Sequence, residues 1–280
     1  MIKEKKEIHL NLDKKPETKV EDSYIRPLQS ANVLFKFMNK LQYIKDILLK
    51  KAIIPRYYEE KLDYLNIDGI DKIAIPMSCF CDIHLNKLVP HMLNYGSYGI
   101  GLSKEWGIKQ GIQPIQYLNP NSNLCKDFSE IFTNAFKISP TERDKVQKYN
   151  NYLLHDLFYM KPLEGEMLIS GGKSVKRNFH DEKEWRFIPN FENVDTELPL
   201  VISQEFMNPK SYYTYSEAIR QCTDLWLNFE FEQIKHIIVS HEEERRELIE
   251  FVIENKIGDG YEQYLLLSKV IVFDELKEDW

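Results

Sequence analysis

Residues 73–80 have the sequence Ile73-Ala74-Ile75-Pro76-Met77-Ser78-Cys79-Phe80, an apolar run that predicts a buried β-strand. Asp82 follows this run and is placed to cap a helix that ends near Gly96. Residues 98–102 then alternate apolar side chains with two glycines, which predicts a strand whose backbone is approached closely by a neighbour. This segment therefore places a helix between two strands.

Strands and helices continue on both sides of this segment. Residues 33–37 predict a strand, and an amphipathic helix follows it and ends before Pro55. Residues 124–160 have the apolar spacing of a helical hairpin inserted between strands. Further strands are predicted near residues 115–118, 166–170, 184–189, 237–240 and 270–273, and further helices near residues 215–228 and 242–255.

The order of these elements predicts the fold class. It lacks the regular alternation of a parallel doubly wound sheet, and no P-loop or GxGxxG turn follows any strand. We expect an α+β fold with mixed or antiparallel sheets, in a single domain over residues 31–280 with a helical insertion at about 124–160. Residues 1–30 are polar and predict an extended or partly ordered arm.

Composition indicates an ordinary globular protein. The 280 residues are 43% hydrophobic and 29% charged, so the chain can bury a sizeable core without disulfides or a metal. The charged N-terminus does not resemble a signal peptide, and no apolar run is long enough to span a membrane. We expect a cytoplasmic protein whose four scattered cysteines are reduced and that does not associate with membranes.

The charge of the chain is unevenly distributed. A net charge of −7 argues against non-specific binding to nucleic acid over the whole surface. Between Lys36 and Arg56, however, six basic residues accompany a single acidic residue, Asp46, and a second basic cluster contains Lys173, Lys176 and Arg177. These clusters can meet phosphates; the alternative is a solvated helix face and a loop.

The most specific local motif is residues 180–189, HDEKEWRFIP. In an extended strand Glu182, Glu184 and Arg186 project to one face, whereas Trp185 and Phe187 project to the other. Two carboxylates on one face can do acid/base work or stabilise a cation. The alternative is a surface ladder of cross-strand charge pairs.

A zinc site is a weaker hypothesis. Cys79, Cys81, His84 and His91 have the right ligand types, but their spacing matches no known zinc module. Buried thiols and surface histidines are the expected arrangement, without a metal. GxSxG and HExxH signatures of hydrolases do not occur in the sequence.

Five stretches carry a resemblance to a known family, namely residues 34–37, 78–91, 95–108, 113–118 and 182–186. They resemble the AbiGi family of abortive-infection proteins, and the likeness extends over most of residues 30–275. The family is usually described as the antitoxin-side partner in a two-gene phage-resistance system.

A more distant resemblance is to ADP-ribosyltransferase-like folds, which share the order of an early strand with a polar residue, a strand with Ser before an aromatic residue, and a late Glu-x-Glu strand. It implies an NAD site in which Lys36 contacts NAD, Ser78 supports the nicotinamide pocket, and Phe80 or Tyr98 stacks on the nicotinamide ring. Glu184 would be the catalytic glutamate that stabilises the developing cation, and Glu182 would assist it.

Two functions are therefore expected for a phage-defence protein. The first is an NAD-dependent ADP-ribosyltransferase that modifies a macromolecule, with a nucleic acid or a protein as acceptor. The second is a non-catalytic antitoxin or partner-binding protein that sequesters a toxin, in which case residues 182–186 have a structural role.

Overall fold

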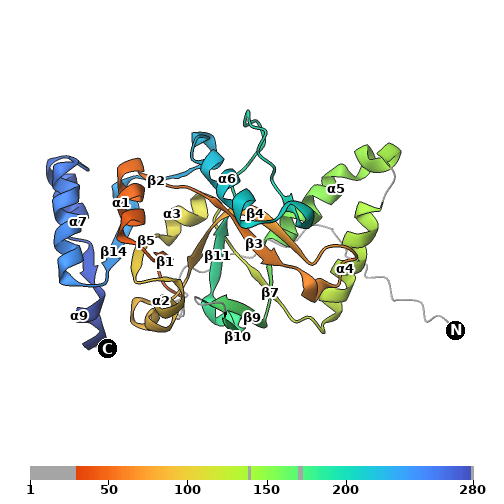
Figure 1. Cartoon of the computed structure of the whole chain (residues 1–280), viewed down its shortest axis with the longest axis horizontal. Coiled ribbons are helices and arrows are strands. Elements are labelled where there is room, and N and C mark those ends of the chain that lie inside the picture. The colour runs from red at the N-terminus through yellow and green to blue at the C-terminus, as the bar shows by residue number, and fades with distance from the viewer. Residues whose placement is uncertain (1–29, 138–139, 170–172, 279–280) are drawn as a thin grey trace, which may run out of the picture.

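The computed structural model describes residues 30–137, 140–169 and 173–278 (Figure 1). The strands are β1 (Val33–Met38), β2 (Ala52–Ile53), β3 (Arg56–Lys61), β4 (Lys72–Cys81), β5 (Tyr98–Ser103), β6 (Gln113–Pro114), β7 (Gln116–Leu118), β8 (Met160–Pro162), β9 (Glu164–Ile169), β10 (Lys173–Asn178), β11 (Glu184–Phe187), β12 (Ile202–Ser203), β13 (Leu227–Asn228), β14 (Ile234–Val239) and β15 (Val270–Val272). The helices are α1 (Leu41–Lys50), α2 (Val89–Tyr95), α3 (Lys104–Lys109), α4 (Asn123–Phe136), α5 (Pro140–Phe158), α6 (Pro209–Ile219), α7 (Glu242–Glu254), α8 (Gly260–Leu267) and α9 (Phe273–Glu278).

The main sheet, as far as the structure describes the chain, has nine strands. Its principal order is β15-β14-β5-β1-β4-β11-β6, and β3 and β12 pair with the first half of β4. All of these pairs are antiparallel except β14 with β15, so the sheet is mixed. The ten-residue β4 is the central element, because β3 pairs with its first half and β11 with its second.

Clusters of buried side chains hold helices against both faces of the sheet. On one face α1 and α7 pack through Ile44, Leu48 and Leu248, in a cluster that also includes Ile237 of β14. On the other face α2 packs through Met92 against a smaller cluster. Figure 1 shows α1, α3 and α6 on one side of the sheet and α2 on the opposite side, with α4 and α5 at the end remote from α7.

Side chains of a neighbouring strand approach the backbone of β5 closely at its two glycines, as the sequence predicts. A Cβ atom added to Gly99 would lie 2.7 Å from Cε1 of Phe37, and one added to Gly101 would lie 2.7 Å from Cγ1 of Val33. Both contacts are with side chains of β1, the strand that pairs with β5. Glycine at these positions leaves room for the Phe35 and Phe37 side chains of β1 against the backbone of β5.

The structure confirms the α+β class and corrects three local predictions. Helix α2 begins at Val89 and not after Asp82, whose carboxylate instead pairs with Lys104. Helix α6 begins at Pro209, earlier than expected, because the Asn208 side chain caps it there, and it ends at Ile219, before a separate 3-10 turn at Thr223–Leu225. Strand β3 was not expected. Helices α4 and α5 occupy the stretch predicted as a helical hairpin.

The N-terminal arm predicted for residues 1–30 lies, except for Ser30, outside the described residues. Within the described part of the chain, none of the helices combines the length and apolar character needed to cross a membrane.

Candidate functional site

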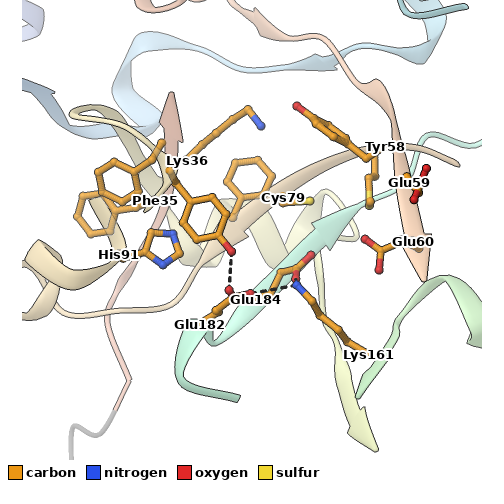
Figure 2. Close-up of a pocket in the computed structure, with 14 residues that line it drawn as sticks. Phe35, Lys36, Tyr58, Glu59, Glu60, Cys79, His91, Lys161, Glu182 and Glu184 are labelled. Carbon is orange, nitrogen blue, oxygen red and sulfur yellow. Dashed lines mark hydrogen bonds and ion pairs between the residues drawn. The ribbon is translucent and has the colours of Figure 1, made fainter. Parts of the chain in front are cut away.

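A cavity of about 240 Å³ opens between β1, β3, β4 and β11 (Figure 2). Aromatic side chains form much of its wall, and charged side chains lie at two of its sides. Figure 2 shows Glu182, Glu184 and Lys161 together on one side, with Lys36 and Tyr58 on the opposite side. The lining residues are Phe35, Lys36, Phe37, Tyr58, Glu59, Glu60, Met77, Cys79, Phe80, His91, Tyr95, Lys161, Glu182 and Glu184.

Strand β11 brings Glu184 and Arg186 to the same face of the sheet, as its alternation predicts. The two side chains are buried, and Arg186 is 0% exposed, so they do not form a surface ladder. Nε of Arg186 donates a hydrogen bond of 2.6 Å to Oε1 of Glu184, and its Nη1 donates one of 2.7 Å to the carbonyl oxygen of Phe158. Nη2 lies 3.0 Å from Oε1 of Glu60 on β3. Arg186 therefore joins three separate elements.

Glu182 is not part of the strand, which corrects the prediction of an extended Glu-x-Glu. It ends a 3-10 turn (Phe179–Glu182), and Lys183 follows with a left-handed backbone (φ 44°). The turn nevertheless keeps Glu182 beside Glu184, because Nζ of Lys161 lies 3.0 Å from Oε2 of Glu182 and 2.9 Å from Oε2 of Glu184. A lysine of β8 thus bridges the two carboxylates.

The charges around Glu184 and Lys161 determine whether these two side chains are ionised. Burial opposes ionisation of Glu184, but the cations of Arg186 and Lys161 outweigh it and hold the pKa of this carboxyl well below its usual range. Burial likewise works against the charged form of Lys161, yet the carboxylates of Glu184, Glu60 and Glu182 raise its pKa. The cluster is therefore a set of ion pairs at neutral pH.

His91 and Tyr95 of α2 complete this side of the cavity. Their rings stack with centroids 4.4 Å apart, and the Tyr95 hydroxyl donates a hydrogen bond to Oε1 of Glu182. Burial, assisted by the positive charge of Arg177, lowers the pKa of His91 to about 4. The imidazole is therefore neutral at physiological pH.

Four of the six residues proposed for an NAD site lie around this cavity: Glu182, Glu184, Lys36 and Phe80. Nζ of Lys36 lies 5.9 Å from the centroid of the Phe80 ring. Two other proposed residues do not line the cavity. Ser78 is wholly buried, and its hydroxyl has no hydrogen-bond partner among the described residues. The Tyr98 hydroxyl hydrogen-bonds to Glu244 of α7.

The residues considered as zinc ligands lie in different parts of the site and do not surround one point. Cys79 lines the cavity, where burial and then the Glu184 carboxylate raise the pKa of its thiol to about 12. Cys81 is buried against Phe35, and His84 lies in a neighbouring hollow. The described residues contain no group of three or more His, Cys, Asp or Glu side chains placed to hold a metal ion.

Sequence reasoning did not find Lys161, Glu60 or Tyr95. Lys161 lies 23 residues from Glu184 in the sequence and comes directly after the long α5, so no local spacing connects the two. Glu60 belongs to β3, whose Arg-Tyr-Tyr-Glu-Glu-Lys sequence has no clear apolar alternation. Tyr95 lies at the end of a predicted helix, and its sequence position gives no signal for a site.

Comparison with known proteins gives one consistent result. The model of a family described as "Putative abortive phage resistance protein AbiGi, antitoxin" matches residues 51–240. A protein of Lactococcus lactis subsp. cremoris named abortive phage resistance protein AbiGi is 35% identical over 252 residues, which cover 82% of this chain and 100% of that protein. No solved structure matches the chain significantly. The expected likeness to ADP-ribosyltransferase folds thus stays a prediction.

Proposed function

Because this chain belongs to the AbiGi family of abortive phage resistance proteins, we propose that it is an antitoxin that acts by binding a cognate toxin protein. The description of the matching family includes the word antitoxin, and an antitoxin implies a toxin as partner. Binding and sequestration need a complementary surface and no catalytic group.

One observation carries this proposal: the carboxylates of Glu184 and Glu182 already accept hydrogen bonds from other side chains of this chain. Glu184 accepts from Arg186 at Oε1 and from Lys161 at Oε2. Glu182 accepts from Tyr95 at Oε1 and from Lys161 at Oε2. A carboxylate stabilises a developing cation through its uncompensated negative charge. Here the carboxylates of Glu184, Glu182 and Glu60 are paired with the cations of Arg186, Lys161 and Arg177. The arrangement suits a buried structural network better than a catalytic pair.

We place the toxin-binding surface on the helical hairpin of α4 and α5. Tyr149 and Tyr152 of α5 are 69% and 66% exposed, and Ile131 of α4 is 55% exposed. Tyrosine is enriched in protein interfaces and in their energetic hot spots, because it offers a large contact area at small entropic cost. The hairpin lies within residues 51–240, the part that matches the family.

Helix α8 provides a matched comparison. Tyr261 and Tyr264 are 76% and 70% exposed at the same spacing of three residues as Tyr149 and Tyr152. Helix α8, however, lies outside the segment that matches the family. A toxin contact shared by the family should therefore use the tyrosines of α5 and not those of α8.

The experiment is co-expression of the chain with the toxin of its own system, scored by growth and by co-purification. We expect Tyr149→Ser/Tyr152→Ser to lose toxin neutralisation and co-purification, and Tyr261→Ser/Tyr264→Ser to keep both. Equal loss in the two double variants, or in neither, would contradict the assignment of the surface. Circular dichroism verifies that both variants are folded.

A second candidate function is an NAD-dependent ADP-ribosyltransferase with a nucleic-acid or protein acceptor. One observation favours it. Four of the six residues to which the resemblance assigns a role in an NAD site line one cavity, namely Lys36, Phe80, Glu182 and Glu184. The volume of about 240 Å³ is small for NAD, since drug-sized ligands occupy about 300–1,000 Å³. It suits a nicotinamide ring alone, so the rest of NAD would extend into neighbouring hollows.

The transferase is tested with labelled NAD, purified wild type and Glu184→Gln, and lysates of infected and uninfected cells. Label transferred to protein or nucleic acid by the wild type alone would support the transferase and reveal its acceptor. Absence of both transfer and nicotinamide release leaves toxin binding as the function.

A further inference from the structure

A second hollow of about 300 Å³ adjoins the cavity, and its wall combines apolar and aromatic side chains with several basic ones. It lies between the end of α1, the start of β3 and the end of α6. Four basic side chains surround it, namely Lys36, Lys50, Arg56 and Arg220, against the single carboxylate of Asp46. Such an excess of positive charge around a concave surface favours a bound anion.

Three of these cations have no anionic partner within the described part of the chain. The ion pairs there include none for Lys36, Lys50 or Arg56, whereas Arg220 has weak contacts of 3.9 Å to Asp46 and 3.6 Å to Glu217. Burial lowers the pKa of Lys36, and the charge of Arg56 lowers it further while Cys79 and Glu184 act in the opposite direction. Lys36 and Arg56 line the same hollow, and an anion between them would relieve the repulsion of their charges.

The hollow and the cavity share one wall. Lys36, Phe37, Tyr58 and Tyr95 line both. Figure 2 shows Lys36 extending toward the Tyr58 side of the cavity, away from Glu182 and Glu184. A ligand can therefore place an anionic group among the cations while an attached ring enters the aromatic cavity past Tyr58.

We propose that these two connected hollows form a binding site for a nucleoside monophosphate or a larger nucleotide. The phosphate is bound by Lys36, Lys50, Arg56 and Arg220, and the base enters the cavity lined by Tyr58, Phe80 and Tyr95. Charge-assisted hydrogen bonds from lysine and arginine suit phosphate oxygens, and aromatic side chains stack on bases. Glu182 and Glu184 lie on the side of the cavity away from Lys36, where they do not face the phosphate. This proposal goes beyond toxin binding and does not depend on it.

The test is isothermal titration calorimetry of the full chain with AMP, inorganic phosphate and adenosine. We expect AMP to bind more tightly than phosphate and adenosine, because only AMP fills both hollows. Arg56→Gln and Lys36→Met should each weaken AMP binding by about tenfold or more. Lys235→Gln, which removes an exposed cation from β14 outside both hollows, should leave AMP binding unchanged.

Three results would overturn the proposal: no binding of AMP by folded wild type, adenosine as tight as AMP, or equal affinity in Arg56→Gln and Lys235→Gln. Arg56 is exposed, so Arg56→Gln remains informative if Lys36→Met fails to fold. Toxin neutralisation is measured separately, with the α5 tyrosine variants. A failure of nucleotide binding is therefore distinguishable from a failure of the antitoxin proposal.

Discussion

Nε of Arg186 lies 2.6 Å from Oε1 of Glu184, and the two side chains are 0% and 9% exposed. This pair connects β11 to β3 through Glu60 and to the end of α5 through the carbonyl oxygen of Phe158. Removal of one partner from such a buried pair leaves an uncompensated charge, which costs more than the pair itself contributes.

Substitution of Arg186 should therefore destabilise the fold strongly. We expect Arg186→Met to lower the free energy of unfolding by about 3–5 kcal/mol in urea denaturation, because the buried Glu184 then keeps only the ion pair with Lys161 and Glu60 loses its ion pair with Arg186. The double variant Glu184→Met/Arg186→Met should lose less than Arg186→Met alone. A double variant less stable than the single one would show that the two residues do not act as a pair.

Gly96 should be the least replaceable glycine of the described chain. It has φ +114°, and an added Cβ would lie 2.1 Å from the backbone oxygen of Met38. Gly111 also has a positive φ of +76° but faces open space, so it is the control. We expect Gly96→Ala to cost more than about 3 kcal/mol and Gly111→Ala about 1–2 kcal/mol in thermal or urea unfolding. Similar losses at the two positions would refute the close contact.

The neutral His91 should make stability depend on pH. Its pKa is about 4 in the folded chain and 6.5 as the ordinary value, so below pH 6.5 the unfolded chain binds a proton that the folded chain does not. Stability is therefore lost as pH falls from 6.5 toward 4. We expect a loss of roughly 1–2 kcal/mol between about pH 7 and pH 5.

The control for this effect is His91→Phe, which keeps an aromatic ring beside Phe37 and Tyr95. Its stability should change less than that of the wild type over the same pH interval. The lowered pKa of Glu184 contributes stability that is lost mainly below pH 4.5, outside this interval. The same pH dependence in His91→Phe and wild type would contradict a buried neutral histidine.

Local patterns were sufficient to predict the strands that form the middle of the sheet. The apolar run of β4 is buried in the structure, and the glycines of β5 lie against side chains of β1. Strand β3 could not be found in this way, since its charged residues lie at an exposed edge and only Tyr57 packs deeply. The three residues that β3 contributes to the cavity, Tyr58, Glu59 and Glu60, could therefore not be predicted either.

The candidate site was predicted only in part, because its pairings are long-range. Glu184 and Arg186 share a strand face, which follows from alternation. The position of Glu182 depends on a left-handed backbone at Lys183, and lysine gives no signal for that conformation. Lys161, which neutralises both glutamates, reaches them from another strand.

The most direct test of the antitoxin proposal is growth of cells that express the chain alone or together with the toxin of its system. Wild type and Glu184→Gln are compared, with folding verified for both. We predict that each is harmless alone and that wild type restores growth in the presence of the toxin. Growth arrest by wild type alone, abolished in Glu184→Gln, would contradict the antitoxin and support the transferase.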